Sequence, residues 1–147
     1  MSIVSLTFSK INAEKSKAIQ GKVNVVNNIA IKNVDKANFI IGKVQQDSLR
    51  FSFEFTSKTE PSIGSIVIEG DVIYMAEPDS VEKVMSDWKE KKPISKEIIT
   101  PVINGILKKC NIEALILSQT MNLPAPIKLP SVSAAEATDN LSTKAEE

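Results

Sequence analysis

The sequence predicts an α+β fold, in which a four-stranded antiparallel sheet is followed by C-terminal helices packed on one of its faces. Polar and apolar residues alternate through much of the first half of the chain, as they do in half-buried strands. Residues 95–130 carry the longest apolar repeat, with the spacing of three to four residues that is typical of a helix. Strands that precede helices without mixing indicate a segregated α+β layout, and short links favour antiparallel pairing.

The first two strands are expected over residues 4–8 and 23–31. Each segment places its apolar residues on one parity, which predicts one buried face. The polar segments 12–21 and 32–36 are expected to be loops. The apolar patch at residues 39–41 is expected to start a strand or to form a crossover loop.

The third strand, residues 49–55, has the clearest alternation and holds three of the five phenylalanines on one face. Residues 57–65 contain a proline and a glycine and indicate a hairpin connection. Residues 66–75 have apolar residues on both parities, which predicts a central strand covered on both faces. Gly70 within it indicates a bulge or the close approach of another backbone.

Two helices follow the strands. Asp79, with Glu82 three residues later, predicts a capping box at the start of the first helix, and Pro93 stops it. Ser95 is expected to cap the long helix, and Pro101 to bend its first turn because proline removes a backbone hydrogen bond.

Residues 1–130 are expected to form a single α+β domain, and residues 131–147 a disordered polar tail. The Leu-Pro-rich segment 123–130 has two interpretations. It can be a helix stop followed by an extended segment laid on the body of the protein, which we favour. It can instead be an extended ligand for another domain.

Composition excludes several classes of function. The 147 residues carry 18 basic and 18 acidic side chains, and Arg50 is the only arginine, so nucleic-acid binding is not expected. One cysteine and no histidine exclude an intramolecular disulfide and a Cys/His zinc site, and we expect no cofactor. No window approaches the roughly 20 apolar residues that span a bilayer, and the N-terminus does not resemble a signal peptide. We expect a cytoplasmic protein without membrane insertion.

Catalytic signatures are also missing. Without histidine, acid–base chemistry would fall to carboxylates such as Glu69 and Asp71, and Asp71 is expected on the wet side of the sheet. Cys110 lies on the apolar face of the long helix, where a small buried side chain is favoured over a reactive thiol. We therefore expect no enzyme.

The order of elements resembles the SecB export-chaperone family. The resemblance rests on LRFSFEFTS, then IVIEGDVIYM with Gly70 before Val72 and Tyr74, a short helix, and PVINGILKKCNIEALILSQTMNLPAPIKLP. It implies a four-stranded antiparallel sheet, a homotetramer built as a dimer of dimers, and an ATP-independent holdase for unfolded clients. Two features depart from the family: this chain is neutral rather than strongly acidic, and its tail has no zinc-binding residues for the SecA motor.

The resulting hypothesis is a holdase-type chaperone that binds non-native polypeptides as a homo-oligomer. A role in protein export and a role as a general or toxin–antitoxin-associated holdase both fit. The alternative is a non-catalytic adaptor domain that uses the C-terminal Leu-Pro segment or a sheet edge. The candidate client-binding residues are Phe39, Ile40, Ile41, Tyr74 and Trp88.

The apolar stripe of the long helix is wider than packing on one sheet requires. One flank can pack on the sheet while the other meets a symmetry-related helix. The candidate oligomer-interface residues are Ile99, Ile103, Ile106 and Cys110.

Overall fold

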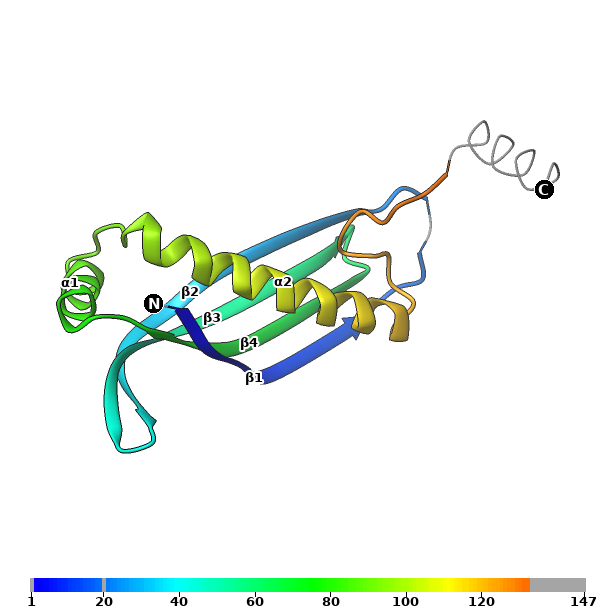
Figure 1. The fold of residues 1–147 in the computed structure, drawn as a ribbon. Helices are drawn as coiled ribbons and strands as arrows, with labels where there is room; N and C mark the ends of the chain where they lie inside the picture. The colour runs from blue at the N-terminus through cyan, green and yellow to red at the C-terminus, as the bar shows by residue number, and fades with distance from the viewer. Residues whose placement is uncertain (1, 20, 133–147) are drawn as a thin grey trace, which may run out of the picture.

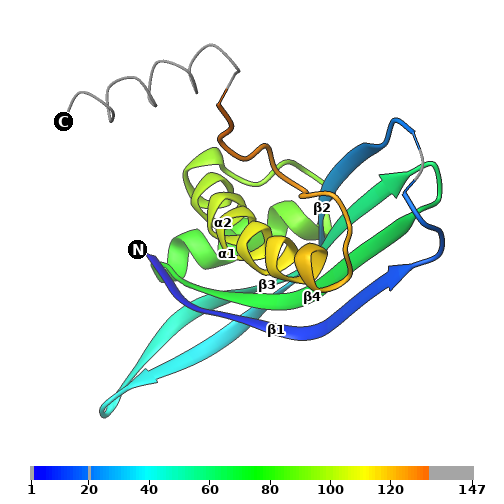
Figure 2. The same ribbon diagram turned by 90° about the vertical axis from the view of Figure 1, so that its right-hand side faces the viewer.

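The computed structural model describes residues 2–19 and 21–132, apart from the side chain of Phe39. Four strands form one antiparallel sheet in the order β1-β4-β3-β2. Both helices lie on the same face of this sheet (Figures 1 and 2). The predicted α+β fold is therefore confirmed. The elements are β1 (Ser2–Lys15), β2 (Asn24–Ile41), β3 (Val44–Glu60), β4 (Gly64–Met75), α1 (Pro78–Lys89) and α2 (Lys96–Thr120).

The strands are longer than the sequence pattern indicates, because bulges change the parity of the buried residues. In β1 the register with β4 shifts twice, between Ile3 and Ser5 and between Phe8 and Lys10. The second shift explains why the alternation breaks before Ile11, and pairing continues to Lys15. Most of the loop predicted at residues 12–21 is correct, but it begins only after Lys15.

Strand β2 is continuous through residues 32–36, so the loop predicted there is wrong. A register shift between Ile31 and Asn33 restores the buried parity at Val34, which lies opposite Phe51. The predicted apolar patch is the end of β2. It leads through Gly42, which has a positive φ of 63°, into β3 at Val44.

The core lies between the sheet and the helices and is centred on the phenylalanine face of β3. Phe51, Phe53 and Phe55 are fully buried there. Gly70 of β4 lies opposite Phe53. A Cβ atom at Gly70 would clash with the Thr7 carbonyl oxygen, so the predicted close backbone approach is confirmed.

The opposite face of the sheet is not covered by any described element. Strand β4 is central, as predicted, but the expectation that both its faces are covered is wrong. Val67, Ile73 and Met75 lie on this open face and are half-buried by their neighbours in the sheet. Strands β1 and β2 form the two edges of the sheet.

Helix α1 packs over β2 and β3 at one end of the sheet. Glu77 is its N-cap residue and Pro78 occupies its first turn, and no side chain caps it. The predicted capping box is therefore wrong. Glu82 instead forms an ion pair with Lys36, which joins α1 to β2. The helix ends at Lys89, before Pro93.

Helix α2 packs over β1 and β4 and runs along the sheet (Figure 1). Ser95 occupies the N-cap position but makes no side-chain cap bond, and the helix continues through Pro101. Lys109 Nζ donates a hydrogen bond of 2.6 Å to the Leu6 carbonyl and lies over the Phe8 ring. The buried stripe repeats every four residues and consists of Ile98, Val102, Ile106, Cys110, Ala114 and Ser118.

The segment after α2 turns back onto the body of the protein, as favoured from the sequence. Leu123 is buried, and Asn27 Nδ2 donates a hydrogen bond of 2.6 Å to the Pro126 carbonyl. Leu129, by contrast, is largely exposed. The tail expected to be disordered lies, from residue 133 onward, outside the described residues. Neither helix of the described part is long and apolar enough to cross a membrane.

Candidate functional site

Three exposed large aliphatic side chains lie together at the tip of the β2–β3 hairpin, and one of them, Ile40, is the most exposed large apolar residue in the described part of the chain. Ile40, Ile41 and Val44 are 68%, 51% and 57% exposed. This tip (cyan) projects beyond the helical layer in both ribbon views (Figures 1 and 2). We call these three residues the hairpin tip. Ile40 and Ile41 are predicted client-binding residues, whereas the side chain of the third, Phe39, lies outside the described part.

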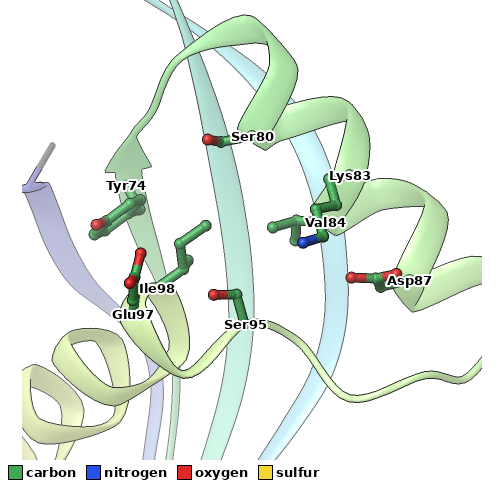
Figure 3. Close-up of a pocket in the computed structure, with 8 residues that line it drawn as sticks. All are labelled: Tyr74, Ser80, Lys83, Val84, Asp87, Ser95, Glu97 and Ile98. Atoms are coloured by element: carbon green, nitrogen blue, oxygen red, sulfur yellow. The ribbon is translucent and has the colours of Figure 1, made fainter.

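A pocket of about 360 Å³ lies between α1, the start of α2 and β4. Figure 3 shows side chains of α1 on one side of it and those of α2 on the other. Its apolar wall is made by Tyr74, Val84 and Ile98, all of which are buried. Its polar wall combines one ammonium group, two carboxylates and two hydroxyls, from Lys83, Asp87, Glu97, Ser80 and Ser95.

Tyr74, another of the predicted client-binding residues, is only 4% exposed. It belongs to the core and borders this pocket on the same side as Glu97 and Ile98, across from α1 (Figure 3). Because its ring is packed by the protein itself, Tyr74 is able to contact a bound chain only through the pocket, and not as part of an open surface.

Trp88 lies in the last turn of α1 and is half-buried. It packs against the hydrophobic core, which fits its interpretation as a packing anchor. It also lines a second pocket together with Lys89, Lys91 and Lys92. Thus the four predicted client-binding side chains that the structure describes all lie at the end of the sheet near α1. They lie in three separate places: Ile40 and Ile41 at the hairpin tip, Tyr74 at the pocket of Figure 3, and Trp88 at the second pocket.

The outward surface of α2 is apolar in its second half. Ile112 and Ile116, one helical turn apart, are 56% and 54% exposed. Leu115 lies in the same half of the helix and is half-buried, and Ile103 and Leu107 are half-buried nearer its start. We call these five residues the α2 surface. Two exposed isoleucines one turn apart, with half-buried aliphatic residues along the helix, are more than single scattered surface residues, and such surfaces mark interaction sites.

Two of the four predicted interface residues are partly accessible on α2, and the other two belong to the core. Ile99 and Ile103 are half-buried. Ile106 and Cys110 are 0% exposed and pack on the sheet, so they cannot contact a second copy, and we correct their assignment to core. Burial raises the pKa of the Cys110 thiol to about 12, partly offset by Lys109, which agrees with a buried, unreactive side chain.

The two carboxylates considered for catalysis lie on the open face of the sheet. Asp71 is half-buried and accepts a hydrogen bond of 2.8 Å from Ser52 Oγ. Glu69 is also half-buried and lies opposite Glu54. Neither lines the pocket of Figure 3. Asp71 therefore lies on the wet side, as expected.

Sequence reasoning missed Val44, Ile112 and Ile116. Val44 follows a glycine and a lysine outside any expected strand, and the hairpin that joins it to Ile41 is visible only when the chain is folded. Ile112 and Ile116 continue the apolar stripe of the long helix in the sequence. Their exposure could have been found from the four-residue repeat of Ile98 to Ala114, because that repeat already fills the face toward the sheet.

Comparison with known proteins gives a structural likeness and no sequence match. No protein family model matches the sequence, and none of the curated proteins matches it. Among solved structures, the chain is similar to a SecB-like chaperone of Mycobacterium tuberculosis in complex with a ChAD peptide from the HigA1 antitoxin. The similarity covers 90% of this chain and 89% of that chain, with 13% sequence identity and a TM-score of 0.48. It is a distant structural resemblance.

Proposed function

We propose that this protein binds exposed apolar segments of non-native polypeptides and keeps them from aggregating, without ATP. The observation that carries the proposal is the hairpin tip, where three large aliphatic side chains are more than half exposed on a projecting hairpin. An apolar surface of this kind is able to bind unfolded chains without reading their sequence, because hydrophobic burial is non-directional.

The size of this surface suits weak, reversible binding. Complete burial of an isoleucine or valine side chain contributes about 1.5–3 kcal/mol, so burial of the exposed parts of Ile40, Ile41 and Val44 contributes about 3–5 kcal/mol. Ordering of the client opposes part of this gain. Tight capture therefore requires several such surfaces at once, and the pocket of Figure 3 offers a second contact nearby on the same end of the molecule.

Oligomerisation would supply these repeated surfaces. We propose that Ile99 and the residues of the α2 surface meet the same helix of a second copy, in a dimer or a dimer of dimers. The exposed fractions of Ile112 and Ile116 support this assignment. Several hairpin tips on one assembly raise the effective concentration of binding sites for one unfolded chain.

Light scattering tests the proposal directly. A chemically denatured test protein is diluted into buffer with or without this protein, in the absence of nucleotide. The proposal predicts that aggregation falls in proportion to the amount of this protein, and that added ATP changes nothing. The same amount of a native, folded test protein should not be bound. An aggregation curve that this protein leaves unchanged would contradict the proposal.

The alternative function is that of an adaptor domain that binds one folded partner. The burial of Leu123 and the hydrogen bond to Pro126 argue against partner binding through the Leu-Pro segment, because these contacts already hold the segment on the body of the protein. The edge of β2 stays available for an added strand. A pull-down that returns one folded partner in a fixed ratio, together with no suppression of aggregation, would favour the adaptor.

A further inference from the structure

We propose that the pocket at the end of α1 selects, among bound polypeptides, segments in which an apolar side chain is flanked by carboxylates. We call it the Trp88 pocket, and its lining residues are Trp88, Lys89, Lys91 and Lys92. This inference rests on the proposed function and adds to it a preference for one chemical class of client segment.

The pocket has room for one large side chain. Its volume is about 580 Å³, and its one aromatic wall is Trp88, which is fixed on its other side against the hydrophobic core. An indole held in this way offers a rigid apolar surface and loses little entropy when a ligand packs on it. The aromatic wall therefore favours an apolar side chain in the pocket.

The rim of the pocket is positive in a chain whose net charge is zero. Residues 89–92, which include every lysine of the pocket lining, hold three lysines and one glutamate, a local charge of +2. The three lysines, Lys89, Lys91 and Lys92, are all exposed. Glu90 pairs with Lys92 at 2.6 Å, which leaves the ammonium groups of Lys89 and Lys91 for an incoming carboxylate. Charge complementarity thus favours an acidic segment around the apolar side chain.

The backbone at Lys91 shows that a lysine is placed there against local preference. Lys92 N–H donates to the Asp87 carbonyl at 2.8 Å, and Lys91 N–H donates to the Trp88 carbonyl at 3.2 Å. These two bonds form a Schellman cap, whose left-handed position is occupied by Lys91 with a φ of 59°. Glycine or asparagine usually occupies this position, because a Cβ atom is strained there.

The end of α2 provides a matched comparison within the same chain. Leu123 N–H donates to the Ser118 carbonyl and Asn122 N–H to the Gln119 carbonyl, which forms the same cap. Here the left-handed residue, with a φ of 54°, is Asn122. Lys89 in the last turn suits the negative end of the helix dipole, but that role does not require a lysine at the strained position. Binding of an anion gives Lys91 a reason to be there.

The experiment uses Trp88 as the reporter, since it is the only tryptophan in the chain. Its emission is followed while the full-length protein is titrated with capped peptides that contain one leucine between glutamates, glutamines or lysines. The proposal predicts that the glutamate peptide binds about fivefold more tightly than the glutamine peptide at low salt, and that the lysine peptide binds most weakly. The advantage of the glutamate peptide should vanish in about 1 M salt, where charges are screened beyond roughly 3 Å.

Lys91→Asn is the decisive variant, because it copies the cap of α2. It should weaken binding of the glutamate peptide about threefold, leave the glutamine peptide unchanged, and keep or raise the Tm. Lys91→Gly should do the same. Lys108→Gln, which removes an exposed lysine from α2, is the matched control and should change nothing.

Equal binding of the glutamate and glutamine peptides would overturn the inference, as would an unchanged affinity of Lys91→Asn for the glutamate peptide. Either result together with intact suppression of aggregation would leave the proposed function standing. If the unmodified protein does not suppress aggregation at all, the proposed function itself is refuted.

Discussion

The hairpin tip gives the sharpest prediction for client binding. The perturbation is the double substitution Ile40→Thr and Ile41→Thr. Threonine keeps the β-branched shape that strands favour, and both positions are more than half exposed, so the fold should not lose stability. The substitution removes apolar groups that only a bound client would bury.

The magnitude follows from the exposed fractions. Each substitution replaces two apolar carbon groups by a hydroxyl, and a buried methylene contributes about 0.8 kcal/mol. Scaled by exposures of 68% and 51%, the loss for the two positions together is about 2 kcal/mol, or about a thirtyfold weaker affinity.

The assay is fluorescence anisotropy of a labelled, permanently unfolded polypeptide titrated with each variant. Val26→Thr is the control, because Val26 lies on the same strand, is 48% exposed and is far from the tip along β2. The control should bind like the unmodified protein. An affinity of the double variant within twofold of the control would refute the assignment of the tip as a client-binding surface.

Three further predictions concern assembly, packing and pH. If the protein forms the proposed oligomer, Ile112→Lys with Ile116→Lys should give a monomer in multi-angle light scattering with an unchanged circular dichroism spectrum, because both side chains are exposed and lysine suits a helix. A mass equal to that of the unmodified protein would exclude the α2 surface as the interface. Gly70→Ala should lower the free energy of unfolding by about 1–3 kcal/mol in urea titrations, since the new Cβ would meet the Thr7 carbonyl oxygen and the Phe53 ring; a stability equal to that of the unmodified protein would contradict the close approach. Burial raises the pKa of Cys110 from 9.0 to about 12, so the thiol of the unfolded state loses its proton first and the free energy of unfolding should fall as pH rises between these values. This fall should be steeper in the unmodified protein than in Cys110→Ala. Equal slopes of unfolding free energy against pH would contradict the burial of a neutral thiol.

The fold class was predictable because its signals are local. The alternation through Phe51, Phe53 and Phe55 and the four-residue repeat through Ile98, Val102 and Ile106 each appear within one element. Element ends were less predictable. Bulges in β1 and β2 move the buried parity by one residue, and the partners that keep Asp35 and Lys36 in a strand come from β3, across the hairpin.

The candidate site was only partly predictable, because exposure depends on how the elements pack. Ile40 and Ile41 stand out in the sequence, and the structure leaves them exposed. Tyr74 and Cys110 are as apolar in their sequence context, yet the sheet and α2 bury them. The strained backbone at Lys91 has no sequence signal, since a lysine near a helix end is common.

Site-specific photo-crosslinking tests the central claim, that apolar segments of unfolded chains dock on the hairpin tip, most directly. A photoreactive phenylalanine analogue replaces Ile41 in one variant and Val26 in a second, and each is irradiated with the same test protein in its unfolded and native forms. We predict crosslinks from position 41 to the unfolded form, few from position 26, and none to the native form. Equal crosslinking of the two forms, or of the two positions, would contradict the claim.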